Sequence, residues 1–347
     1  MKLLDKFYLG DLELKNRVVM PPMDTYESIN GFVNEFHFAH YGARAIGNVG
    51  LIIQEVTSVR ADGRISTQDL GIWKDEHVEG LKKLVDSVHK LGSKIGIQIG
   101  DAGRKGLIKD GDILSSSNIP FNDYFNKPRK MNKQDILNVI NDFKLASRRA
   151  QLAGYDYLEL HAAHGYLINQ FLSEFSNDRN DEYGGSFENR TRFLKEILVE
   201  VRKEFRGVVG IRVSAFEWTK DGYLPEELAK ALLSFKDSFD IVHVSSGGTV
   251  NEGELSFYPG YQLNFAKKMK AILNKPVISV GQIDSFDIAE LAIREFDIDL
   301  IAVGRALLRN PNWIMDESFK NGLEMESRKV INRGYYRERF LEKKLRK

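Results

Sequence analysis

Eight short apolar runs recur along the chain, and segments with helical periodicity lie between most of them. The runs are rich in Val, Ile and Leu, which is typical of strands buried on both faces of a parallel sheet. The intervening segments have the apolar spacing of amphipathic helices. The runs cover 16–23, 50–57, 94–100, 155–162, 208–215, 240–246, 276–282 and 298–304, and the helical candidates include 75–91, 133–153, 186–205 and 284–295.

Buried strands that alternate with helices predict an α/β fold, here a (β/α)8 TIM barrel. A doubly wound sheet is the alternative, but it usually has a Gly-x-Gly-x-x-Gly turn after its first strand, and "VVMPPMDTYE" contains no glycine. No linker divides residues 1–347, so we expect one domain with a C-terminal tail at about 323–347. A polar stretch at about 104–130, after the third strand, is too long for an ordinary loop and predicts a lid or hairpin over the barrel mouth.

Composition narrows the function classes. The net charge of +1 argues against a general nucleic-acid binder. The chain has no cysteine, which excludes disulfides, thiolate nucleophiles and cysteine-based metal sites. The N-terminus lacks an apolar signal segment, and no run approaches the roughly 18 apolar residues of a membrane span. We therefore expect a cytoplasmic protein with a small-molecule substrate and neither nucleic acid nor membrane as a partner.

The chemistry of a TIM barrel is located where the strands end and the βα loops begin. The loops after strands 7 and 8 usually bind phosphate through backbone N–H groups. Gly281 and Gly304 lie at these two turns, and Arg305 adds a positive charge. Glycines that merely turn the chain into helices are the alternative, but two such turns at the expected strands favour a phosphate site.

Polar residues within two other strands indicate a ligand with polar edges. Gln98 and Arg212 each interrupt an apolar run, and buried polar groups need partners. Arg212 could pair with a structural carboxylate such as Glu159. Alternatively, Gln98 and Arg212 line the floor of the mouth and hydrogen-bond a planar ligand. Together with a phosphate site at strands 7 and 8, flavin mononucleotide (FMN) fits this set of residues well.

His161 and His164 follow the fourth strand, and Tyr166 comes two residues later. An i, i+3 pair that opens a helix places both imidazoles on one side, so both can donate to one oxygen. A core histidine bonded to a backbone carbonyl would explain either one alone. Zinc would need further ligands, and the sequence offers no cysteine and no obvious third histidine. We therefore expect no metal, a carbonyl or anion held by the pair, and a proton supplied by Tyr166.

Long, ordered motifs run through nearly the whole chain. They include "LKNRVVMPPM", "GRISTQDLGIW", "IQIGDAGRKG", "AGYDYLELHAAHGYLINQFLS", "SNDRNDEYGGSFENRTRF" and "VGRALLRNP". These motifs resemble the old yellow enzyme family of NADH:flavin oxidoreductases, in particular its bacterial YqjM-like branch. The resemblance implies a barrel that holds FMN at the strand C-termini and uses NADPH or NADH as reductant. Without cysteine there is no thioether link, so the FMN is expected to be non-covalent.

The resemblance also implies an activity and a role for each matching residue. The activity is ene reduction: flavin N5 delivers hydride to the activated C=C bond of an α,β-unsaturated carbonyl or nitro compound, and Tyr166 protonates the product. The implied cofactor-binding residues are Pro22, Met23, Asp24, Val56, Gln98, Arg212, Gly281, Gly304 and Arg305. The implied substrate-binding residues are Tyr26, His161, His164 and Arg333. Arg333 matches an arginine that reaches into the neighbouring subunit, which implies a homodimer or a dimer-based tetramer.

Two positions depart from the family pattern. Asp24 stands where the branch usually has a cysteine beside the flavin, and Asp101 stands where it usually has a histidine. These carboxylates could face the mouth, or they could be solvated or paired with Arg104 or Lys105.

Two other functions remain open. A flavin-dependent amine dehydrogenase or demethylase could use Asp24 and Asp101, with Trp218, to attract a cation. The histidine pair argues against it, because imidazole donors suit an anionic or carbonyl oxygen. A non-enzymatic flavin-binding redox sensor would not need the histidines and Tyr166.

Overall fold

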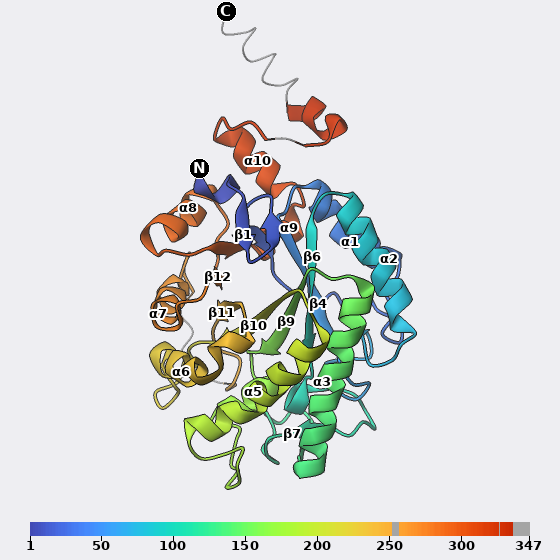
Figure 1. Ribbon diagram of the computed structural model, residues 1–347, viewed down its shortest axis with the longest axis vertical. Coiled ribbons are helices and arrows are strands. Elements are labelled where there is room, and N and C mark those ends of the chain that lie inside the picture. The colour runs from blue at the N-terminus through green and yellow to red at the C-terminus, as the bar shows by residue number, and fades with distance from the viewer. Residues whose placement is uncertain (252–256, 326, 336–347) are drawn as a thin grey trace, which may run out of the picture.

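The computed structural model describes residues 1–251, 257–325 and 327–335. Eight parallel strands form a closed barrel, because β13 pairs with β3 and β3 pairs with β4 (Figure 1). Each falls on one of the predicted apolar runs, so the predicted TIM barrel is confirmed. The barrel strands are β3 (Val18–Met20), β4 (Leu51–Ser58), β6 (Lys94–Gly100), β9 (Tyr157–Ala162), β10 (Val208–Ser214), β11 (Ile241–Ser245), β12 (Val277–Ser279) and β13 (Leu300–Ala302).

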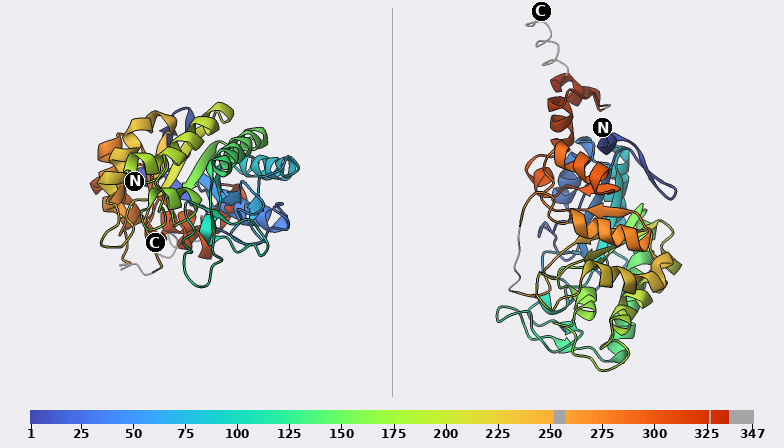
Figure 2. Two further views of the ribbon diagram at one scale, coloured as in Figure 1. Left: turned by 90° about the horizontal axis from the view of Figure 1, so that it is seen from below. Right: turned by 90° about the vertical axis from the view of Figure 1, so that its left-hand side faces the viewer.

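Helices follow every barrel strand and surround the barrel (Figure 2). Local signals define their ends. Helix α3, for example, begins after Asn132, which forms a capping box with Asp135, and ends at Gly154 with φ 87°. The helices are α1 (Glu35–Ile46), α2 (His77–Lys90), α3 (Lys133–Ala153), α4 (Leu167–Leu172), α5 (Phe187–Glu204), α6 (Pro225–Leu232), α7 (Leu263–Leu273), α8 (Phe286–Glu295), α9 (Arg305–Arg309) and α10 (Trp313–Lys320). Short 3-10 turns are η1 (Lys2–Leu4), η2 (Gly103–Lys105) and η3 (Leu233–Ser238).

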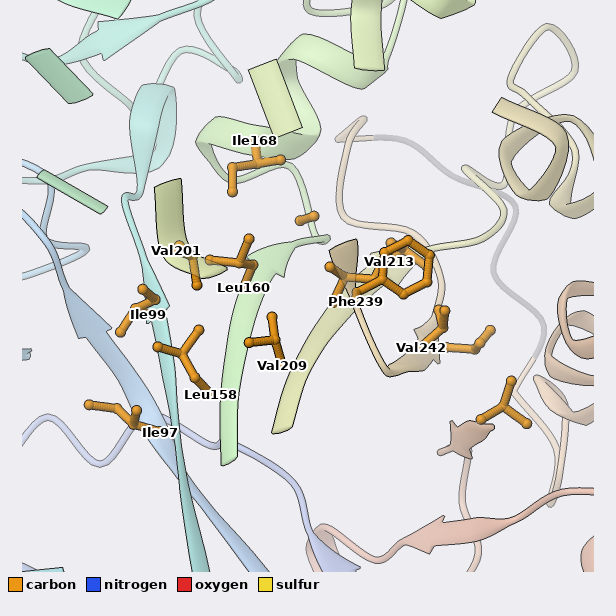
Figure 3. Close-up of a cluster of buried hydrophobic side chains, with 14 of the residues drawn as sticks. Ile97, Ile99, Leu158, Leu160, Ile168, Val201, Val209, Val213, Phe239 and Val242 are labelled. Carbon is orange, nitrogen blue, oxygen red and sulfur yellow. The ribbon is translucent and has the colours of Figure 1, made fainter. Parts of the chain in front are cut away.

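Side chains alternate between the two faces of each strand, and this alternation separates the core from the barrel interior. Leu158 and Leu160 of β9 pack outward in the cluster that also contains Ile97 of β6 and Val201 of α5 (Figure 3). The side chains between them along β9, such as Glu159, therefore point into the barrel. The same period-2 rule turns Gln98, Arg212 and His243 inward, which explains polar residues within otherwise apolar strands.

A short hairpin seals the N-terminal end of the barrel. Strands β1 (Phe7–Leu9) and β2 (Leu12–Leu14) are antiparallel, and Leu9 and Leu14 belong to an apolar cluster of inward-facing residues. That cluster includes Val19, Leu51, Ile53, Tyr157, Ile241, Ile278 and Leu300. The base is therefore apolar and covered by the hairpin, and the polar inward residues lie nearer the C-terminal ends of the strands.

The insertion after the third barrel strand is not a hairpin. It contains β7 (Leu114–Ser115) and β8 (Arg129–Lys130), which pair in parallel, whereas a hairpin requires antiparallel strands. That part of the prediction is wrong, and a lid role stays a prediction. A further short strand, β5 (Leu70–Gly71), extends the sheet beside β4.

The predicted tail at 323–347 is described only in part, because residues 326 and 336–347 lie outside the described residues. Residues 329–335 are helical and lie at the end of the molecule opposite to β7 (Figures 1 and 2). Among the described residues there is no helix with the length and apolar character that a bilayer span requires.

Gly210→Ala should destabilise the barrel. An added Cβ would lie 2.0 Å from the Tyr157 hydroxyl oxygen, inside a packed interior. Overpacking of this kind costs about 1–3 kcal/mol. Urea unfolding of wild type and variant should show a clearly lower midpoint for the variant. The control is Gly334→Ala, where an added Cβ meets no described atom within 4 Å; a midpoint loss as large in the control would contradict the explanation.

Candidate functional site

A cavity of about 360 Å³ opens at the C-terminal ends of the strands. Its walls come from the loops after β3, β12 and β13 and from inward residues of β10 and β11. The volume is in the range of small-molecule sites. The predicted cofactor residues in its wall are Pro22, Met23, Arg212, Gly281, Gly304 and Arg305.

The part of the wall after β12 and β13 is suited to a phosphate group. Gly281 has φ 135°, a conformation that residues with a side chain rarely adopt. Gly304 directly precedes α9, and Arg305 and Arg309 of that helix both line the cavity. Glycine backbone and two guanidinium groups on one wall form a site for an anion.

Arg212 is buried in the cavity wall and keeps an open donor. Its Nη1 lies 3.4 Å from the Pro22 carbonyl oxygen, and its Nε has no partner among the described residues. The alternative ion pair with Glu159 is not formed among the described contacts. Glu159 instead accepts a hydrogen bond of 2.8 Å from Gln98, which does not line the cavity. A buried guanidinium with an open N–H fits the acceptor-rich edge of a flavin.

His161 is a neutral N–H donor beside the cavity. The Ala163 backbone N–H donates to its Nδ1 at 3.3 Å, so Nδ1 carries the lone pair and Nε2 carries the proton. Burial, reinforced by the charge of Arg212, holds the pKa of His161 well below its ordinary value. The imidazole therefore stays neutral and offers Nε2–H to a ligand.

His164 lies in a left-handed turn with φ 57°, and the following helix begins only at Leu167. The prediction that the two histidines open a helix is therefore wrong. The turn nevertheless brings the rings together, with centroids 5.2 Å apart. Nε2 of His164 lies 2.8 Å from the Ser245 hydroxyl, so Nδ1 is the nitrogen left for a ligand. Lys105 donates to the His164 carbonyl at 2.8 Å and holds the turn.

Tyr166 lies against His161, with ring centroids 4.7 Å apart. Burial, and next the carboxyl of Asp24, raise the pKa of Tyr166 well above its ordinary value, so the phenol keeps its proton. Tyr26 is half exposed in the loop after β3, and burial and Asp24 raise its pKa to about 12. Both hydroxyls therefore remain protonated at neutral pH.

Three carboxyl groups gather on this side of the mouth. Burial, then Asp69 and Glu55, raise the pKa of Asp24 to about 7, although the Val56 backbone N–H donates to its carboxyl group. Burial also raises the pKa of Glu55 to about 7, against hydrogen bonds from Thr25 and Tyr41. Asp69 lines a smaller cavity together with Val56, His161 and Tyr166. Asp24 and Asp69 act electrostatically on the predicted proton donor, Tyr166, whereas Glu55 is bonded to Thr25 and Tyr41.

Asp101, the second departure from the family pattern, has a structural role. Arg60 Nε donates to its carboxylate at 2.8 Å, and the Gly103 backbone N–H donates at 2.8 Å. Arg104 and Lys105 bind backbone carbonyls instead, including that of Thr249. The alternative pairing with Arg104 or Lys105 is therefore not formed, because Arg60 from another loop pairs with the acid. Asp101 also lines a smaller cavity together with His161 and Tyr166.

Arg333 does not belong to the mouth of its own chain. It is exposed and lies on the helical segment 329–335, at the end of the molecule opposite to β7. A contribution to a neighbouring subunit, and with it a homodimer or dimer-based tetramer, stays a prediction. In the part of the chain that is described, no group of three or more His, Asp or Glu side chains could hold a metal ion.

The sequence matches the NADH:flavin oxidoreductase / NADH oxidase family over residues 2–326. The chain belongs to this family. It is 43% identical over 339 residues to an NADPH dehydrogenase of Clostridium acetobutylicum, covering 96% of this chain and 100% of that protein. It is 42% identical over 337 residues to an NADPH dehydrogenase of Bacillus subtilis, covering 96% and 99%. The protein is thus an FMN-dependent flavin oxidoreductase of the old yellow enzyme family.

Proteins of known structure that share this fold include reductases and a dehydrogenase. Morphinone reductase is 28% identical with a TM-score of 0.78, over 94% of this chain and 91% of that chain. Histamine dehydrogenase from Rhizobium sp. 4-9 is 26% identical with a TM-score of 0.82, over 92% of this chain and 48% of that chain. A 2-naphthoyl-CoA reductase is 25% identical with a TM-score of 0.86, over 93% and 52%. This chain spans about half the length of the last two proteins.

Sequence reasoning missed several residues of the flavin oxidoreductase site. Glu55 interrupts an apolar run as Gln98 and Arg212 do, so the same signal could have identified it. Ser245 ends β11, a position typical of site residues, but its bond to His164 is not visible in the sequence. Asp69 has no periodic signal, because it lies in an irregular loop.

Asp24→Asn should change the flavin midpoint potential in a pH-dependent way. With a pKa of about 7, Asp24 is neutral at low pH and becomes an anion as the pH rises. An anion near the flavin disfavours the reduced, negatively charged form. Spectroelectrochemistry should give equal potentials below about pH 6 and a lower wild-type potential above about pH 8. The control is the exposed Asp237→Asn; equal potentials of wild type and D24N at every pH would show that Asp24 has no electrostatic role.

Proposed function

We propose that this protein is an NADPH-dependent ene-reductase that reduces the activated C=C bond of α,β-unsaturated carbonyl or nitro compounds. The observation that carries the proposal is the pairing of a neutral N–H donor, His161, with a protonated phenol, Tyr166, at a ring distance of 4.7 Å. Similarity to NADPH dehydrogenases supports NADPH as the reductant, and NADH is the alternative.

The residues that would hold FMN are Arg212, Gly281, Gly304 and Arg305, together with the backbone of the loop after β3. FMN held there would supply the hydride chemistry, with the substrate β-carbon as the acceptor. His161 Nε2–H and His164 would hold the substrate oxygen and stabilise the negative charge that develops on it. Tyr166 would donate its hydroxyl proton to the α-carbon.

Amine dehydrogenation is the second candidate, because histamine dehydrogenase shares the fold. One contact weighs against it, because the carboxylate of Asp101 is paired with Arg60 and is not free to bind a substrate cation. The redox-sensor alternative leaves the positions of the histidines and Tyr166 without an explanation.

Anaerobic half-reactions test the proposal. The purified yellow protein is titrated with NADPH until the flavin is bleached and is then mixed with 2-cyclohexenone or N-ethylmaleimide. We expect reoxidation with one equivalent of saturated product per flavin. Bleaching of the oxidised flavin by histamine or trimethylamine, without reoxidation by the enones, would instead establish the amine oxidation.

His161→Ala combined with His164→Ala should slow enone reduction by about a hundredfold or more, because donors that stabilise developing negative charge are lost. Stopped-flow reoxidation by cyclohexenone measures the effect. His89→Ala, which removes a histidine bonded to Asp156 far from the cavity, is the control. If the double variant were reoxidised at the wild-type rate, His161 and His164 would not be the groups that hold the substrate oxygen.

Tyr166→Phe should slow protonation selectively. A positioned general acid typically contributes about 10²–10⁴-fold, so a weakly activated enone should be reduced more slowly by at least the lower value. Flavin reduction by NADPH should change much less. Tyr124→Phe, at an exposed tyrosine, is the matched control. Unchanged rates with the weakly activated enone would mean that the proton comes from another group.

A further inference from the structure

The barrel interior holds a fully buried carboxylate, Glu159, two residues before His161 on β9. Oε1 of Glu159 accepts a hydrogen bond from Gln98 Nε2 at 2.8 Å. Oε2 accepts from the Tyr157 hydroxyl at 2.8 Å and lies 2.9 Å from His243 Nδ1. These partners come from β6, β9 and β11, so the carboxylate joins three strands of the barrel.

Two glycines make room for one of these partners. A Cβ on Gly210 would lie 2.0 Å from the Tyr157 hydroxyl, and a Cβ on Gly96 would lie 2.5 Å from Tyr157 Cδ1. Any side chain at either position would displace the ring. Glycine on both neighbouring strands therefore allows the hydroxyl to reach Glu159.

A buried cation lies one layer above Glu159. Strands β9 and β10 pair with Glu159 opposite Gly210 and with His161 opposite Arg212, so both charged side chains point inward from adjacent strands. Arg212 lines the cavity, has an unpartnered Nε and forms no ion pair with a described residue. Burial alone would raise the pKa of Glu159, but the hydrogen bond with His243 and the charge of Arg212 hold it below its ordinary value, while burial lowers the pKa of His243 itself. Glu159 is fully buried and accepts from the Gln98 amide and the Tyr157 hydroxyl, which favours the anion, and its interaction with Arg212 takes place in a medium of low dielectric constant.

We propose that Glu159 is a positioning residue that sets the electrostatics of the flavin site from below. The negative charge of Glu159 balances the positive charge of Arg212. Glu159 also accepts a hydrogen bond from the Gln98 amide nitrogen, Nε2, so the Gln98 amide oxygen, Oε1, is left as an acceptor. The proposal rests on the proposed function in placing FMN in the cavity. An anion below the flavin disfavours the reduced, negatively charged form, so Glu159 lowers the midpoint potential and makes the reduced cofactor a stronger hydride donor.

Glu159→Gln in the FMN-loaded protein tests this proposal, because it keeps the volume and removes the charge. The midpoint potential should be higher than that of wild type, and reoxidation by cyclohexenone should be slower. Tyr157→Phe is the matched control, because it removes one donor to Glu159 and keeps the charge. It should lower the melting temperature and leave the potential unchanged.

A structural role alone would lower the melting temperature of both variants and shift neither potential, and that result would overturn the proposal. If Glu159→Gln does not fold, redox-induced infrared difference spectra of wild type labelled with ¹³C-glutamate replace it. A carboxylate band that shifts on flavin reduction and is retained in the labelled Glu55→Gln variant supports the proposal, and the absence of any such band overturns it. Wild-type reoxidation by enones tests the proposed function separately, so the two can fail independently.

Discussion

The alternation of side chains along buried parallel strands is the constraint on which this structure depends. Every second residue of a barrel strand packs outward against helices, and those positions must be apolar for the outer core to form. The positions between them are free of that demand. At the base they are apolar and meet the N-terminal hairpin, whereas nearer the C-terminal ends they are Gln98, Glu159, Arg212 and His243. The barrel thus holds charged and hydrogen-bonded side chains in its interior, with Arg212 in the wall of the cavity, without weakening its outer core.

The same burial determines the protonation states at the mouth. Removing a group from water disfavours its charged form. The histidines are therefore neutral, His161 is an N–H donor and Tyr166 keeps its proton, while Asp24 and Glu55 titrate near neutral pH. Glu159 is the contrasting case, because the hydrogen bond with His243 and the charge of Arg212 outweigh the effect of burial on its pKa. Neighbouring carboxyl groups in one site thus have different charges, and each state follows from the partners of that group.

Features that depend on interactions between residues close in sequence were predictable, whereas contacts between distant segments were not. The strands and major helices were predictable because their periodicity is a local property, as at β6 and α3. The candidate site residues were predictable as a group, because parallel strands end at one rim. The errors concern contacts between distant segments. The partner of Asp101 is Arg60, and β7 pairs in parallel with β8, and neither contact leaves a local pattern.

The sequence by itself determined the barrel, the family and some of the residues around the cavity, because strand period, strand count and motif order are properties of the chain alone. Only the tertiary structure decided which nitrogen of His161 carries the proton, since that depends on the Ala163 N–H in the following turn. It also decided that Glu159 is bonded to Gln98 and His243 and not paired directly with Arg212. Charge states and hydrogen-bond partners depend on distances across strands, and those distances exist only once the barrel has closed.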